Sequence, residues 1–151
     1  MGVNLKNYTS SISAQNTISY IEQYLIEAKA TGIMKKVEDG QVVALVFEIL
    51  DEKGIKRLVK LPANVDAVWE YLWRDYVTSR TRPKKTQEDF REQAARTAWK
   101  IVQDWVQVQV SMIKLNQMTV LQVFMPMIFD GQQTYYEYLQ GNNFKALPAP
   151  K

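Results

Sequence analysis

The stretch "TQEDFREQAARTAWKIVQDWVQVQVSMIKL", residues 86–115, decides the fold because it carries the longest regular pattern in the chain. Thr86 and Asp89 resemble a capping box, in which two side chains satisfy backbone amides at the start of a helix. Projected at about 100° per residue, the stretch has one narrow polar stripe and an apolar face opposite it. The polar stripe comprises Glu92, Arg96, Lys100, Gln103, Gln107, Ser111 and Lys114, and the apolar face comprises Phe90, Ala94, Ala98, Ile101, Trp105, Val108 and Met112. The pattern predicts a helix from Gln87 to Leu115, roughly 40 Å long, that crosses the whole molecule.

The part of the chain before this helix predicts another helix and a small sheet. Ser13 is a candidate N-cap, and apolar residues recur at helical spacing from Ile18 until Gly32 ends the pattern. The pair Asp39–Gly40 separates two apolar runs, which is the strongest short signal for a β-hairpin. The second run, residues 42–50, is apolar on both faces, as is typical of a central strand. A third strand follows over residues 55–61, and a second helix begins after Pro62 with Asn64 as its cap.

Two further capping boxes follow the long helix, at Thr119–Gln122 and Thr134–Glu137, and each predicts a short helix. We therefore expect an α+β fold with an N-terminal helix, a three-stranded antiparallel meander, and a helical C-terminal half built on the long helix. The length of 151 residues predicts a single domain over residues 1–151. Within it we expect a flexible arm over residues 1–12, a basic loop over 79–86 and a proline-containing tail over 142–151.

The composition excludes several classes of chemistry. The chain is 46% hydrophobic and 23% charged, as is ordinary for a globular protein, and it contains no cysteine and no histidine. Disulfides, thiolate metal sites and histidine-based catalysis are therefore excluded. The N-terminus shows no signal peptide, and the longest apolar stretch is too short to span a bilayer, so a cytoplasmic protein is expected.

The acidic residues give little sign of a catalytic or metal site. Glu88 and Glu92, one turn apart, could hold Mg²⁺, but carboxylates at this position also stabilise a helix N-terminus, and we favour that interpretation. Asp104 lies close to the apolar face and is expected to pair with Lys100. We therefore predict no catalytic residue, no metal and no cofactor, and we expect a protein that is not an enzyme.

The basic residues form the main candidate site. Between Arg74 and Lys100 there are eight cations and four anions, a local net charge of +4, whereas the whole chain carries +3. Such a concentration can bind nucleic-acid phosphates, or it can be a solvated loop. The candidate nucleic-acid-binding residues are Arg80, Arg82, Lys84, Lys85, Arg91, Arg96 and Lys100, with Lys56, Arg57 and Lys60 of the third strand. The strand cations could equally protect a sheet edge against aggregation.

Aromatic and sulfur side chains offer two more candidate sites. Trp99, next to Lys100 at the margin of the polar stripe, could stack on nucleic-acid bases or pack beneath the loop, whereas Trp69, Trp73 and Trp105 are expected in the core. Met112, Met118, Met125 and Met127 could fill the core or form an adaptable binding surface. The second possibility predicts a protein-interaction module, an inhibitor or adaptor of an enzyme, that docks through segment 118–129 or forms homo-oligomers.

Four stretches together resemble a family of small, uncharacterised proteins, about 150 residues long, from phages and prophage-like elements. They are "VVALVFEI", "VKLPANVDAVWEYL", "ARTAWKIVQDWVQVQVSMI" and "MTVLQVFMPMI", and the resemblance covers residues 9–139. It implies a mobile-element setting in the host cytoplasm and favours DNA metabolism or host interference, but it confers no site residues. The expected function is therefore a non-enzymatic accessory protein that binds single-stranded DNA or RNA, with a protein-interaction module as the alternative.

Overall fold

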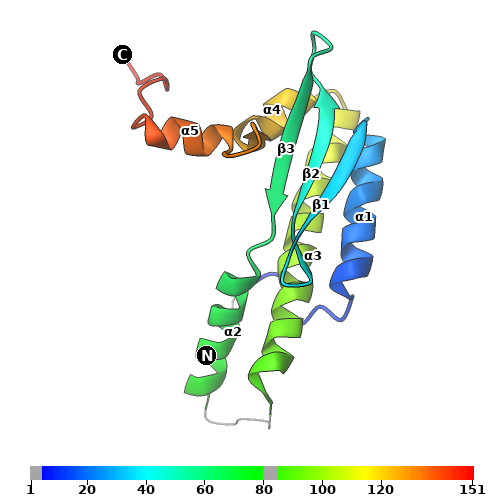
Figure 1. Ribbon diagram of the computed structural model, residues 1–151, viewed down its shortest axis with the longest axis vertical. Coiled ribbons are helices and arrows are strands. Elements are labelled where there is room, and N and C mark those ends of the chain that lie inside the picture. The colour runs from blue at the N-terminus through cyan, green and yellow to red at the C-terminus, as the bar shows by residue number, and fades with distance from the viewer. Residues whose placement is uncertain (1–4, 80–84) are drawn as a thin grey trace.

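The computed structural model describes residues 5–79 and 85–151 and has the expected α+β architecture (Figure 1). The sheet of these residues is antiparallel, with the strand order β1-β2-β3-β4. Helices α1 and α3 cover one face of it, α2 lies beyond the sheet alongside the N-terminal half of α3, and α5 projects from the body. The elements are α1 (Ala14–Glu27), β1 (Gly32–Glu38), β2 (Gln41–Leu50), β3 (Lys56–Pro62), α2 (Val65–Thr78), α3 (Gln87–Lys114), α4 (Val120–Phe124), the 3₁₀-helix η1 (Met125–Met127), β4 (Ile128–Phe129) and α5 (Tyr135–Gly141).

Local sequence signals set the ends of these elements. Asp39 and Gly40 both have positive φ, 50° and 77°, as the tight turn between β1 and β2 requires. The predicted N-caps Ser13 and Asn64 accept hydrogen bonds from backbone amides of α1 and α2. All three capping boxes are formed at α3, α4 and α5. These predictions are confirmed because each depends only on residues a few positions apart.

The core lies between the sheet and the pair α1 and α3. The central strand β2 is buried on both faces, as predicted, with Leu45 and Val46 0% and 4% exposed. On the helix side, Phe47 meets the ring of Phe124 edge-on, with centroids 5.1 Å apart. The fully buried side chains here include Ile21, Leu25, Val59, Val106 and Val110.

The buried face of α3 differs from the predicted one. Gln103, placed on the polar stripe by its spacing, is 6% exposed, whereas Trp105 and Val108 of the predicted apolar face are 37% and 56% exposed. The reason is the unequal length of its neighbours. At 1.5 Å per residue, the 14 residues of α2 span about 21 Å, against about 42 Å for the 28 residues of α3. Helix α2 therefore covers this face only near the N-terminus of α3, where Phe90 contacts Tyr76.

The sheet has one strand more than the predicted meander. Two residues of β4 pair with β3, Phe129 with Leu58 and Ile128 with Val59. A strand of two residues is too short to show an alternating pattern in the sequence. Because of this pairing, β3 is not an edge along its whole length.

Residues 5–12 do not form a detached arm but lie along α3. The hydroxyl of Thr97 donates to the carbonyl of Asn7 at 2.8 Å, and Gln93 Nε2 donates to the carbonyls of Tyr8 and Ser10 at 3.0 and 3.1 Å. Polar side chains of α3 thus satisfy backbone carbonyls that have no partner in a strand or helix.

Two fully buried threonines provide a test of this packing. No hydrogen-bond partner of Thr17 Oγ1 is found among the described residues, whereas Thr97 Oγ1 donates to Asn7 and accepts from Gln93. Replacing Thr17 by Val should raise the free energy of unfolding by about 1 kcal/mol, because a buried hydroxyl without a partner is removed. Thr97→Val, the matched control, should lower it by about 1–3 kcal/mol, because the Asn7 carbonyl loses one of its two donors and Gln93 loses an acceptor. Urea denaturation measures both, and equal effects of the two substitutions would contradict the assignment.

Candidate functional site

The basic residues of α3 are engaged by their own chain. Arg91 forms an ion pair with Asp66 and stacks over the ring of Trp69, with its guanidinium carbon 4.8 Å from the centroid. Arg96 donates to the carbonyl of Ser10 and to Gln93 at 3.2 and 2.7 Å. Lys100 pairs with Asp104 at 3.6 Å, as predicted. These contacts leave fewer free cations on α3 than the sequence indicates.

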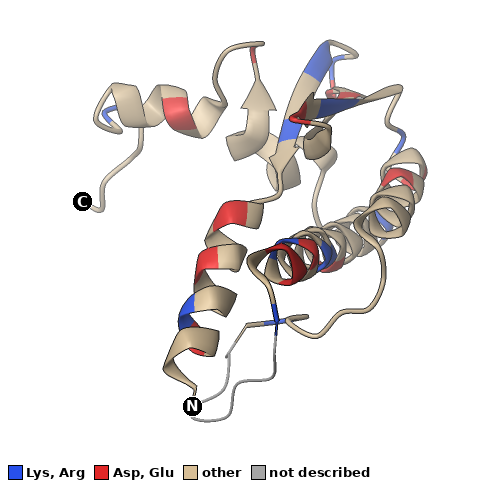
Figure 2. Ribbon diagram, turned by 60° about the horizontal axis from the view of Figure 1, so that its bottom comes forward, with Lys and Arg blue, Asp and Glu red and all other residues tan. Residues whose placement is uncertain are grey.

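The remaining candidate cations lie elsewhere. Arg80, Arg82 and Lys84 fall outside the described residues, and Lys85 lies 5.9 Å from the ring centroid of Phe90. Lys56 faces Glu48 at 3.9 Å, Arg57 bonds to Asp51 at 3.1 Å, and Lys60 lies 5.2 Å from the centroid of Phe129. Lys56 and Lys60 alternate with the buried Val59, so they are on the face of β3 turned away from α1 and α3. Figure 2 shows basic residues of the strands and of α3 in separate places, with acidic residues near both.

Trp99 is buried and unavailable for stacking on a base. Its side chain is 1% exposed, because it shares the core face of α3 with Val106 and Val110. The exposed position considered from the sequence is therefore wrong; Trp99 is packed, but against the sheet and not beneath the loop. Helical spacing placed Trp99 at the margin of the polar stripe, but the sheet covers that margin.

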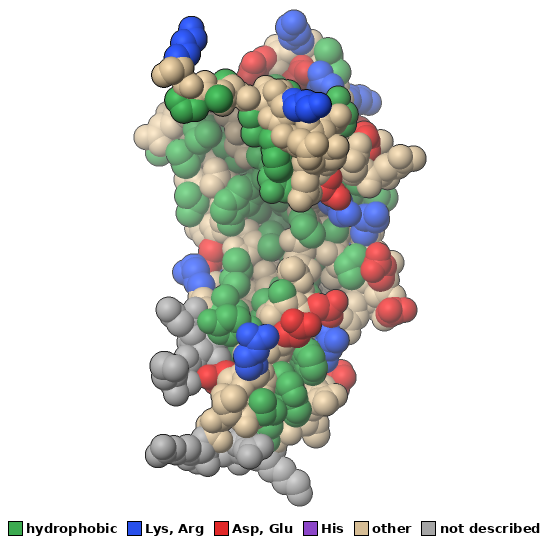
Figure 3. All heavy atoms as spheres, turned by 90° about the vertical axis from the view of Figure 1, so that its left-hand side faces the viewer, with side chains coloured by type: hydrophobic (Ala, Val, Ile, Leu, Met, Phe, Trp, Pro, Cys, Tyr) green, Lys and Arg blue, Asp and Glu red, His purple; other side chains and the backbone are tan. Residues whose placement is uncertain are grey.

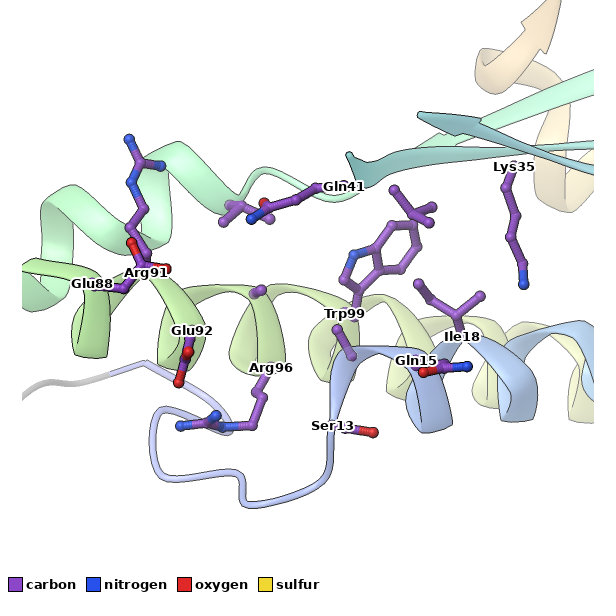
Figure 4. A pocket seen from close by; sticks show the side chains of 14 residues that line it. Ser13, Gln15, Ile18, Lys35, Gln41, Glu88, Arg91, Glu92, Arg96 and Trp99 are labelled. Carbon is purple, nitrogen blue, oxygen red and sulfur yellow. The ribbon is translucent and has the colours of Figure 1, made fainter. Parts of the chain in front are cut away.

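Three of the sequence candidates, Arg91, Arg96 and Trp99, meet at one cavity of about 480 Å³ (Figure 4). It lies between the start of α1, the β1–β2 hairpin and α3. Trp99 points from α3 toward the sheet, and Glu88 and Glu92 accompany the arginines along the helix. A rim with both signs of charge gives the cavity no preference for an anion.

The perturbed carboxylates among the described residues all shift downward. In four of them the largest cause is a hydrogen bond from a backbone amide at a turn or helix start, which lowers the pKa; they are Asp51, Asp89, Asp130 and Glu137. Burial alone raises the pKa of Asp104, but the hydrogen bonds from Asn7 and Lys6 and the charge of Lys100 outweigh it and lower the pKa. A general acid working at neutral pH needs a raised pKa, so these groups are suited to structural roles.

Neither a metal site nor a membrane span is found among residues 5–79 and 85–151. No cluster of three or more acidic side chains is placed to hold a metal ion. None of the helices in this part of the chain is both long and apolar enough to cross a bilayer.

The largest unexpected feature is an uncovered apolar row on α3, which we call the α3 seam. It consists of Ile101, Trp105, Val108, Met112 and Leu115. Trp105, Val108 and Leu115 are 37%, 56% and 69% exposed, and Ile101 and Met112 are half-buried. The row continues the face that α2 covers near the N-terminus of α3. Its periodicity is visible in the sequence, but its exposure is not.

Further aromatic side chains lie beside Trp105 and on the projecting α5. The ring of Trp105 lies 5.9 Å from that of Phe124 in α4. From there the chain passes through η1 and β4 to α5, whose Tyr136 and Tyr138 are 51% and 52% exposed. Figure 3 shows hydrophobic side chains gathered on the face between the projecting α5 and α2.

Segment 118–129, predicted as a docking surface, is divided between core and surface. Val123, Phe124 and Phe129 are 7%, 0% and 9% exposed, whereas Met125 is 40% exposed. The segment therefore anchors α4 and β4 to the body and offers only part of its length to a partner.

Comparisons with known proteins give no guide to function. No protein-family model, no curated protein and no solved structure matches this chain. We therefore infer function from the contacts, exposures and charges of the chain itself.

The carboxylate of Asp104 ties residues 5–12 to α3 and predicts a pH dependence. It accepts from Asn7 Nδ2 at 2.8 Å and pairs with Lys6 at 3.2 Å. Because its folded pKa is lowered, its contribution is complete above the unfolded value, about 3.9, and is lost as the pH falls through the folded value. Asp104→Asn should lower the free energy of unfolding by on the order of 1 kcal/mol at pH 7. Urea denaturation between pH 7 and strong acid should show this difference closing below about pH 4; a difference that is constant with pH would contradict the role.

Proposed function

We propose that the protein is a non-enzymatic protein-interaction module, an adaptor or inhibitor, that binds through the α3 seam and the neighbouring aromatic side chains of α5. The observation that carries this proposal is the exposure of Val108 in the middle of α3 and of Leu115 at its C-cap, on the side opposite the buried Trp99, Val106 and Val110. Apolar side chains that are contiguous on a surface, rather than scattered singly, commonly mark a contact with another protein.

The chemistry of the side chains supports this proposal. The chain has no histidine or cysteine, and the perturbed carboxylates are held ionised by hydrogen bonds. Trp, Tyr and Met are the side chains enriched at the centres of protein interfaces. Trp105, Met112 and the tyrosines of α5 are of this kind.

The proposed contact surface differs from segment 118–129, which the sequence suggested as the docking surface. Met125 is the one large hydrophobic side chain of that segment that is exposed, so the seam and α5 replace the segment as the main contact. The sequence resembles a family of phage and prophage proteins, and in that setting a host or phage protein would be a suitable partner. A second copy of this chain would be an equally suitable partner.

Site-specific photocrosslinking tests the proposal. A benzophenone amino acid at position 108 should form protein adducts in cells that express the chain, because Val108 is 56% exposed within the seam. The matched control is position 26, where Ile26 is 61% exposed on the solvent side of α1 and should form none. Mass spectrometry identifies the attached protein. Equal adduct yields at both positions, or none at 108, would overturn the proposed function.

Nucleic-acid binding is the second candidate function. It is favoured by one observation, that Lys85, which follows residues 80–84 in the sequence, lines a cavity of about 600 Å³ together with Arg96. Asp75, Asp89 and Glu92 line the same cavity, so its charge is mixed. Arg80, Arg82 and Lys84 precede Lys85 in the sequence, and Arg96 is already bonded to the carbonyl of Ser10.

Salt-dependent binding of a labelled single-stranded oligonucleotide tests this candidate. Replacing Arg80, Arg82, Lys84 and Lys85 by Ala should flatten the log–log salt slope by up to about 3–4 units, because up to four phosphate contacts are lost. A control of equal charge replaces four exposed lysines elsewhere and should leave the slope unchanged: Lys53, Lys145 and Lys151 by Ala, and Lys29, whose φ is positive, by Asn. An unchanged slope in the first variant would exclude the basic segment as the site.

A further inference from the structure

We infer that the α3 seam is covered by the α3 seam of a second copy, which makes the protein a twofold-symmetric dimer. This inference rests on the proposed function, because it names the partner of the same surface. A second copy is chosen as the single partner because of the spacing of the seam residues, the charges beside them and the elements that surround the seam.

The spacing fits a helix as the partner. The seam residues follow one another at intervals of four, three, four and three, from Ile101 to Leu115. This is the heptad spacing of a two-helix coiled coil, in which side chains of one helix insert between those of the other. A helix that faces solvent does not require such a row, and a flat protein surface does not match it. A facing helix with the same spacing matches the row.

The charge fits an identical partner. Between Ile101 and Leu115 the charged residues are Asp104 and Lys114, and both are paired within the chain. Asp104 binds Lys6 and Lys100, and Lys114 binds Glu27. In coiled coils, charges beside the seam select the partner and its direction. Here no net charge remains to repel an identical surface, and no unpaired charge beside the seam favours a different partner.

The surroundings of the seam favour an antiparallel pair. Helix α2 lies on the same face of α3, just N-terminal to the seam (Figure 1). In a parallel pair the two α2 helices would compete for one space. In an antiparallel pair each α2 comes to lie beyond the C-terminal end of the other copy's α3, on the side toward which α5 projects.

The antiparallel arrangement also adds area to the contact. Five side chains of one seam are fewer than the roughly 20–30 residues, about 800 Å², that each partner contributes to a standard interface. With α2 of one copy next to α5 of the other, the exposed Tyr136 and Tyr138 join the contact. Aromatic side chains bury about 150–250 Å² each, so half-exposed tyrosines contribute about 100 Å² apiece.

Light scattering of the purified full-length chain, coupled to size exclusion, tests the inference from micromolar to near-millimolar concentration. The mass of one chain is 17.5 kDa, and the wild type should show twice this mass at the higher concentrations. Val108→Glu should halve the observed mass, because it buries a charge in the interface, while the circular dichroism spectrum is retained. Leu115→Glu is a second variant at the more exposed end of the seam and should act in the same way. Ile26→Glu, at an equally exposed position on α1, should remain a dimer.

The outcomes separate the two proposals. A wild type that is monomeric at every concentration, or a Val108→Glu variant that stays dimeric, would overturn the dimer. If that monomer still forms adducts with another protein from position 108, the interaction function stands without the dimer. If it forms none, both fail.

Discussion

Helix α3 is apolar on two opposite sides, and the way in which these sides are covered organises the molecule. On one side Trp99, Val106 and Val110 are buried against α1 and the sheet over most of the helix. On the other side α2 covers the first turns, and Phe124 of α4 then contacts Trp105. Phe124 also meets Phe47 of the central strand, so one ring connects the sheet, α4 and the outer side of α3.

The proposed function follows from what this packing leaves uncovered. The outer side of α3 is longer than α2, and α5 turns away from it, so a row of apolar side chains remains at the surface. Burying such a row stabilises an association by roughly 25 cal/mol for each Å² removed from water, before the entropy lost on association is subtracted. The charged residues near the row are already paired, so apolar contact would be the main source of affinity for the proposed partner.

The same pairing explains why counting charges overstated the basic surface. Arg91, Arg96 and Lys100 count toward a net positive segment, yet each has a partner in the fold. Two of those partners, Asp66 and the carbonyl of Ser10, are 25 and 86 positions away from their cation in the sequence. Linear charge density therefore predicted the presence of cations but could not predict how many remain free to bind phosphate.

The sequence by itself determined the helix starts, the Asp39–Gly40 hairpin, the central position of β2 and the length of α3. Each is encoded by residues within one or two turns of each other, where capping, turn geometry and periodicity act. The tertiary structure alone decided that Trp99 is buried and Val108 exposed, that β4 extends the sheet, and that residues 5–12 lie along α3. These depend on which neighbour reaches which side of a helix, and that is set by the lengths and directions of elements distant in the chain. Periodicity identifies an apolar side, but only packing determines whether the chain itself covers it.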